Sequence, residues 1–206
     1  DGIMDSAVNA LALSAPFQKA ATKLLRRHIQ RNYNDLGELE ESLKVKIFEF
    51  INGEEEQQIV ALKLLEMIAF NSALLSQWLD PITLKRLYCL CINGSMSIKT
   101  AYIKFISAAT VKSQPLIILL METFERLDFI VDLLESDNLR IIQNALFFLV
   151  SFNNQMTYKP EVLKFRRKLA SVPGIEDLLL DLKDDCSLSE CAEMLLDGLN
   201  CLHIGE

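Results

Sequence analysis

Cysteine and histidine are the residues of this sequence best suited to metal or nucleophilic chemistry. Cys186, Cys191 and Cys201 lie near the end of the chain, and His203 follows the last of them. A structural zinc site usually contains a closely spaced Cys or His pair on a loop or hairpin. The Cys201 and His203 pair instead falls at the end of a predicted helix. We therefore interpret these cysteines as buried or half-buried reduced thiols, and we expect no metal and no cofactor.

The other histidine and the carboxylates do not form the pattern of a known catalytic site. His28 lies in a basic segment, without a nearby Ser or Cys on a strand-turn-helix elbow. The glycines occur singly at predicted helix ends, so the sequence contains no glycine-rich phosphate-binding loop. Acidic runs fall at predicted helix starts, where the helix dipole and solvent explain them. We therefore expect no enzymatic activity and no catalytic residues.

The overall composition is that of a globular protein with an acidic balance. Of the 206 residues, 50% are hydrophobic and 24% are charged, and the formal net charge is −7. Binding to nucleic acid or to an acidic membrane requires a concentrated positive surface, which this balance disfavours. The sequence contains no run of about 18 apolar residues, so we expect no membrane-spanning segment.

Cysteine use and the first residues bear on location and completeness. Five cysteines at irregular spacing in a helix-rich chain favour reduced thiols, and therefore the cytoplasm or the nucleus. The sequence begins with Asp-Gly, without an initiator Met or a visible signal peptide. We expect it to be a domain excised from a longer protein.

Two short segments are basic despite the acidic total. The cations around His28 are Lys23, Arg26, Arg27 and Arg31, and those of the later segment are Lys164, Arg166, Arg167 and Lys168. Each segment spans one or two helical turns, and a solvated helix face is the simplest interpretation. The alternative is a salt-dependent contact with acidic protein or with RNA.

Helical periodicity runs through nearly the whole chain, and strand signals are almost absent. Proline in a first turn, as at Pro16 and Pro81, and Asn-Gly pairs at helix ends, as at 93–94, divide the sequence into helices. We predict a partial helix over 5–13 and about twelve further helices in four sets of three. Their ranges are 17–31, 36–51 and 55–70; 72–79, 81–92 and 95–109; 113–124, 126–135 and 138–153; and 160–170, 174–183 and 187–202.

The four sets predict a repeated structural unit within a single domain, 1–206. The approximate repeats are 16–70, 71–110, 113–153 and 159–203. Equivalent points lie about 38 to 47 residues apart, which is the period of helical solenoid repeats.

Residues 127–152, LDFIVDLLESDNLRIIQNALFFLVSF, resemble an armadillo repeat. Their second helix ends in a Leu-Leu pair, and a short polar break leads to a third helix with an Asn-Ala element. Residues 174–199 are similar, with Ala192 at the position of Ala145. The resemblance implies an all-α, right-handed α-solenoid of about four three-helix repeats, with the two-helix HEAT class as the nearest rival. It also implies a concave surface, lined by the third helices, that binds extended peptides or helices.

In family members such as importin α and β-catenin, the third helix presents a Trp and, four residues later, an Asn to this concave surface. Aligned on Asn144 and Ala145, this sequence has Phe147 and Ser151 at those two positions. The other repeats likewise combine a bulky apolar residue with a small one. The candidate partner-binding residues of the concave face are Leu65, Ile68, Ala69, Ile103, Ile106, Ser107, Phe147, Val150, Ser151, Met194 and Gly198.

The absence of the Asn ladder favours a ligand that satisfies its own backbone. An extended peptide would leave N–H and C=O groups unpaired, at a cost of about 1–3 kcal/mol each. A helix pairs these groups internally and offers an apolar stripe. We therefore predict that the concave face binds an amphipathic helix or an apolar peptide.

An alternative alignment, shifted by one residue, rotates the helix by about 100°. In that case Phe147 and its equivalents are core residues. The surface is then polar and consists of Arg140, Gln143, Asn144 and Asn154.

We predict that the protein is a non-catalytic adaptor or scaffold that binds another protein through a short helical or extended motif. Two other functions remain open. One is a nucleotide-exchange cofactor of an Hsp70 chaperone, because armadillo domains also occur in such factors. The other is a helical-repeat RNA-binding module that uses the two basic segments, which the acidic balance disfavours. Self-association through an exposed apolar track is a further option.

Overall fold

The computed structural model describes residues 2–32, 36–37, 39–69, 71–110, 114–155 and 159–203. All regular secondary structure within these ranges is helical, which confirms the predicted all-α class. The helices form two compact units, residues 1–80 (unit 1) and residues 81–206 (unit 2).

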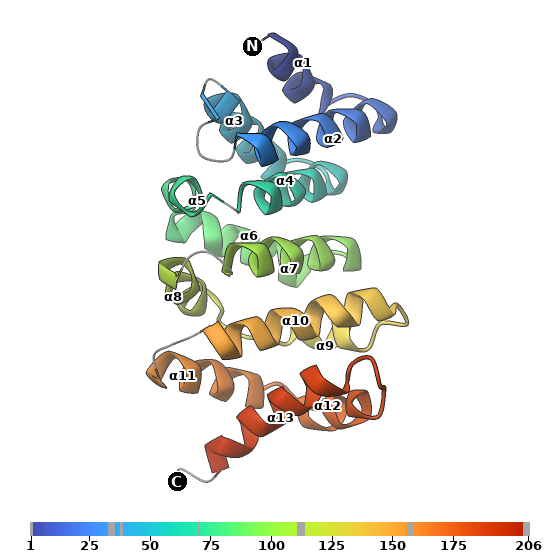
Figure 1. The fold of residues 1–206 in the computed structure, drawn as a ribbon, viewed down its shortest axis with the longest axis vertical. Coiled ribbons are helices and arrows are strands. Elements are labelled where there is room, and N and C mark those ends of the chain that lie inside the picture. The colour runs from blue at the N-terminus through green and yellow to red at the C-terminus, as the bar shows by residue number, and fades with distance from the viewer. Residues whose placement is uncertain are drawn as a thin grey trace. The chain divides into compact units, whose positions relative to one another are not determined.

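Unit 1 is built from helix pairs. Its helices are α1 (Gly2–Ala10), α2 (Ala15–Arg31), α3 (Leu39–Ile51), α4 (Glu55–Ile68) and α5 (Ser72–Trp78). Helix α1 packs against α2 and α3, α3 packs against α4, and α2 packs against α4 (Figure 1). The predicted partial helix is therefore α1, and the first predicted repeat combines α2 with the α3–α4 pair.

Unit 2 contains three helices that pack in series, α7, α10 and α13, with α10 in the middle (Figure 1). They are the third helices of the later predicted repeats. Helix α6 packs against α7, α9 against α10, and α12 against α13. The bounds in unit 2 are α6 (Pro81–Asn93), α7 (Met96–Thr110), α8 (Gln114–Thr123), α9 (Phe129–Leu134), α10 (Leu139–Gln155), α11 (Lys159–Ala170), α12 (Ile175–Lys183) and α13 (Ser189–His203).

Local signals set several of these helix boundaries. Helix α6 begins at Pro81, and Pro16 lies in the first turn of α2, where its missing N–H costs nothing. Before α5, the Asn71 Oδ1 accepts a hydrogen bond of 3.0 Å from the Leu74 N–H, as an N-cap does. Gly174 precedes α12 with a φ of +74°, a left-handed conformation that other residues disfavour.

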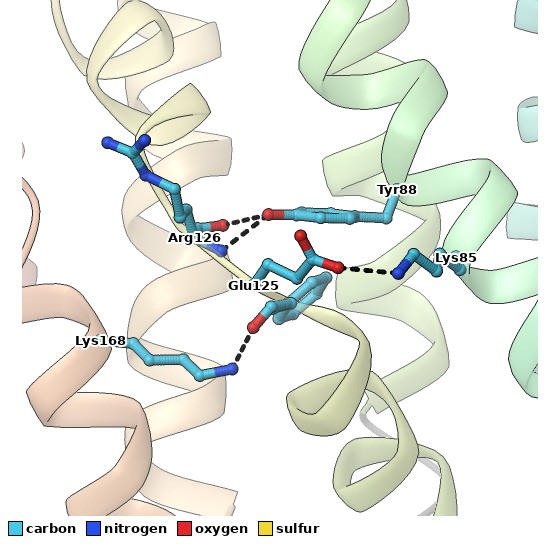
Figure 2. Close-up of polar contacts among 6 residues, drawn as sticks. Lys85, Tyr88, Glu125, Arg126 and Lys168 are labelled. Atoms are coloured by element: carbon cyan, nitrogen blue, oxygen red, sulfur yellow. Dashed lines mark hydrogen bonds and ion pairs between the residues drawn. The ribbon is translucent and has the colours of Figure 1, made fainter.

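Helix α9 is shorter than the predicted 126–135, and Arg126 lies in the loop before it, where a distant side chain holds its backbone. The Tyr88 hydroxyl in α6 donates to the Arg126 carbonyl oxygen at 2.7 Å and accepts from the Arg126 N–H at 2.8 Å (Figure 2). Both backbone groups of Arg126 are therefore bonded to Tyr88 instead of to a helix.

A row of buried aromatic rings forms the core of unit 2. The ring centroids are 5.7 Å apart for Tyr88 and Phe124, and 6.2 Å apart for Phe124 and Phe148. The row continues from Phe148 to Phe152 at 5.0 Å and from Phe152 to Phe165 at 5.6 Å. Because these residues come from α6, the turn after α8, α10 and α11, consecutive repeats share one core.

Candidate functional site

The exposed edge of α10 carries one large aromatic side chain among polar ones. Phe147 is 54% exposed, Arg140, Gln143 and Asn154 are exposed, and Val150 is half-buried. Their spacing of three, four or seven residues places them on one side of the helix. The other sides of α10 are covered, because it packs against α7, α9, α11 and α13.

Helix α13 repeats this pattern of exposure with acidic residues. Met194, which is 37% exposed, aligns with Phe147, and Glu190 aligns with the exposed Gln143. Equivalent helices of consecutive repeats present equivalent edges. We call the two edges together the third-helix face, which consists of Arg140, Gln143, Phe147, Val150, Asn154, Glu190, Glu193, Met194 and Asp197.

The alignment fails for α7, where the prediction of an exposed edge is wrong. Ile103, the equivalent of Phe147, is 1% exposed, and Ile106 and Ser107 are buried as well. The reason is that α7 packs against α6, α8, α9 and α10, which cover most of its circumference. Within α7 only Met96 and Ser97, at its start, are exposed.

The other predicted partner-binding residues that the structure buries are small side chains or belong to the core. Leu65 and Ile68 are buried in α4, and Ala69, its C-cap, is buried as well, so these residues belong to the core and cannot contact a ligand. Ser151 and Gly198 are buried too. At Gly198 an added Cβ would lie 3.2 Å from the Arg166 Nε and 3.2 Å from the Asn153 Oδ1, atoms of a hydrogen-bonded pair that covers the glycine. A continuous apolar track across all repeats is therefore absent from the described residues.

The alternative polar surface shares the exposed side of α10 with Phe147. Arg140, Gln143 and Asn154 are exposed. Asn144 is half-buried, and its Nδ2 donates to the Arg140 carbonyl oxygen at 2.7 Å. The two alternatives thus describe neighbouring residues of one surface, and in α10 both contain exposed positions.

The second basic segment is partly engaged in helix packing. The Arg166 Nε donates to the Asn153 Oδ1 at 2.9 Å. The Lys168 Nζ donates to the carbonyl oxygens of Met121, at 2.8 Å, and of Phe124. Burial lowers the pKa of Lys168. The other two cations of this segment, and all four of the first segment in α2, are exposed.

The late cysteines differ in exposure from the prediction. Cys186 and Cys201 are exposed, because they lie in the turn before α13 and near its end, whereas Cys191 is half-buried. Within the described residues, no group of His, Cys, Asp and Glu side chains is arranged to hold a metal ion, and the side chain of His203 lies outside them. None of the helices in these ranges is sufficiently long and apolar to cross a membrane.

Solved structures show what this arrangement of helices is similar to. A designed armadillo repeat protein in complex with the peptide (KR)4 has a TM-score of 0.54 and 14% identity, over 95% of this chain and 99% of that chain. The fold is armadillo-like. Computationally designed armadillo repeat proteins for modular peptide recognition give a TM-score of 0.53 at 14% identity and the same coverage. An engineered protein solved by a structural genomics consortium gives 0.59 at 15% identity, over 95% and 98% of the two chains.

No known family profile and no curated protein sequence matches this chain. The armadillo-like assignment therefore rests on the arrangement of the helices, and it confirms the predicted α-solenoid class. Helices α7, α10 and α13 correspond to the predicted third helices, and at the positions aligned with Phe147 and Ser151 they carry neither Trp nor Asn.

Proposed function

We propose that this chain is a non-catalytic adaptor module that binds a short segment of another protein on the third-helix face. The exposure of Phe147 carries this proposal. An aromatic side chain surrounded by polar ones is typical of an interface hot spot with its rim. The similarity to designed armadillo proteins, one of them in complex with a peptide, supports a peptide as the class of ligand.

The composition of the face favours a helical segment with one or two apolar anchors and basic flanks. Phe147 and Met194 offer apolar surface, and Glu190 and Asp197 place carboxylates beside Met194. A helix satisfies its own backbone, so it needs no Asn ladder on the receptor. Because the rest of the predicted apolar track is buried, we expect a dissociation constant in the micromolar range, which corresponds to a binding free energy of about −8 kcal/mol.

The test is a selection of peptides from a displayed library against the whole 206-residue chain. We expect Phe147→Ser to weaken the selected peptides by about tenfold or more, since hot-spot truncation costs about 2 kcal/mol. The matched control is Leu180→Ser, because Leu180 in α12 is 52% exposed and lies outside the face. If Phe147→Ser binds every peptide as well as the unsubstituted chain, the proposal is wrong.

We also propose that the module works in a reducing compartment, the cytoplasm or the nucleus. The cysteines of the described residues are free thiols, and two of them are exposed on α13 and the turn before it. Disulfides are rare in such compartments and common outside them.

A further inference from the structure

Helix α2 in unit 1 carries a dense row of cations on its exposed side. Lys19, Lys23, Arg27 and Arg31 follow one another at four-residue intervals, and Arg26 lies beside them. All five are exposed, and α2 contains no acidic residue. Residues at intervals of four lie on one side of a helix, so the five positive charges form a single ridge.

The ridge lacks acidic partners within the described part of the chain. Other exposed lysines form ion pairs, such as Lys85 with Glu125 at 2.8 Å and Lys183 with Glu193 at 2.9 Å. Among the described residues, no carboxylate pairs with a cation of the ridge. In a chain with a net charge of −7, this ridge is a local positive field suited to an acidic ligand.

An exposed apolar stripe runs beside the ridge. Phe17 is 61% exposed and Leu24 is 39% exposed. Ala20 lies between them, and Leu13 lies just before the N-cap Ser14; both are exposed. Spacing of three and four residues places Phe17, Ala20 and Leu24 in a stripe on one side of α2. The surface therefore combines apolar contact area with a parallel row of cations.

We propose that α2 is a second binding surface, which takes an acidic amphipathic helix of a partner protein. The apolar side of such a helix covers the stripe of Phe17 and Leu24, and its flanking carboxylates lie over the ridge. Three of the five cations are arginines, whose planar guanidinium groups bind carboxylates through two parallel hydrogen bonds. This surface is separate from the third-helix face, which lies in unit 2.

Other occupants match the surface less well. An anionic bilayer binds helices that insert a broad apolar face. The broader apolar side of α2, with Ala21, Leu25 and Ile29, is already buried in unit 1. RNA would neutralise the cations and make no use of a row of apolar side chains.

The test uses the whole chain and a synthetic helical peptide with Leu at i, i+4, i+7 and i+11 and Glu at the flanking positions. We expect binding, measured by fluorescence anisotropy, that a scrambled peptide of equal composition does not show. Phe17→Ser combined with Leu24→Ser weakens this binding by about tenfold or more, and so does Arg27→Glu combined with Arg31→Glu. Because all four side chains are exposed, the variants retain the helical circular dichroism of the parent.

Two controls connect the effect to the proposed contacts. A peptide with Lys in place of Glu binds the Arg27→Glu and Arg31→Glu variant more tightly than it binds the unsubstituted chain. Lys164→Glu combined with Arg167→Glu, which reverses two exposed cations of α11, leaves the binding of the Glu peptide unchanged. Phe147→Ser leaves it unchanged too, so the failure of one proposed surface is distinguishable from the failure of the other.

Four outcomes overturn the proposal. In the first, the scrambled peptide binds as tightly as the helical one, so that binding depends on net charge alone. In the second, poly(U) RNA binds more tightly than the helical peptide, and in the third, phosphatidylserine vesicles bind more tightly than that peptide. In the fourth, the chain alone sediments as a dimer and the Phe17→Ser variant as a monomer, so that a second copy of the chain covers the stripe.

Discussion

Tyr88 and Tyr102 are both buried in unit 2, but their hydroxyl groups differ in hydrogen bonding. The Tyr88 hydroxyl bonds to both backbone groups of Arg126. The Tyr102 hydroxyl has no partner among the described residues. Burial raises the pKa of both phenols, so both stay protonated at neutral pH. At the scale of single residues, the Tyr88 hydroxyl thus holds the backbone of Arg126 in place, whereas burial of the unpaired Tyr102 hydroxyl lowers the stability of the fold.

We expect the change from Tyr to Phe to have opposite effects at these two positions. Tyr88→Phe leaves the N–H and C=O of Arg126 without their partner and lowers the free energy of unfolding by about 1–3 kcal/mol. Tyr102→Phe removes a buried unpaired group and leaves that free energy equal or higher. Urea unfolding followed by circular dichroism measures both changes. A clear loss of stability in Tyr102→Phe would contradict this account.

Lys168 acts at the scale of helices, because it ties α11 to the end of α8. Its Nζ donates to the carbonyl oxygen of Met121, in the last turn of that helix, and to that of Phe124, directly after it. The last carbonyls of a helix lack partners within it. We expect Lys168→Met to lower the free energy of unfolding by about 1–3 kcal/mol, because these carbonyls then lose their donor. Lys164→Met, at an exposed position of the same helix, changes it by less than about 0.5 kcal/mol. Equal thermal midpoints for the two variants would show that the contacts with Lys168 contribute nothing.

The positions of the helices could be predicted from the sequence because their ends depend on local residues. Pro81 begins α6, and the 93–94 pair ends it. The start of α9 could not be predicted, because Tyr88 holds Arg126 across 38 residues of sequence. Exposure depends on every packed neighbour as well. Phe147 and Ile103 occupy aligned positions, yet four helices enclose α7 and bury Ile103, which no periodicity within α7 reveals.

At the scale of the whole molecule, unit 2 is a compact unit with its own core within residues 81–206. The aromatic row from Tyr88 to Phe165 and the ties made by Tyr88 and Lys168 all connect helices of this unit. The third-helix face also lies within it, whereas the cationic ridge of α2 belongs to unit 1. The two proposed surfaces can therefore be separated by dividing the chain between Asp80 and Pro81.

We expect a fragment of residues 81–206 to fold without unit 1 and to unfold cooperatively in urea, because it retains its own aromatic core. Two adjacent substitutions in α10 test whether that core is native. Phe148→Ala empties a buried site and lowers the free energy of unfolding by about 3–5 kcal/mol. Phe147→Ala changes it by less than about 0.5 kcal/mol, because that ring is exposed. A fragment with helical circular dichroism, no cooperative transition and equal responses to the two substitutions would show that unit 2 needs unit 1. A folded fragment should bind the peptides that depend on Phe147 and fail to bind the acidic helix, since it lacks α2.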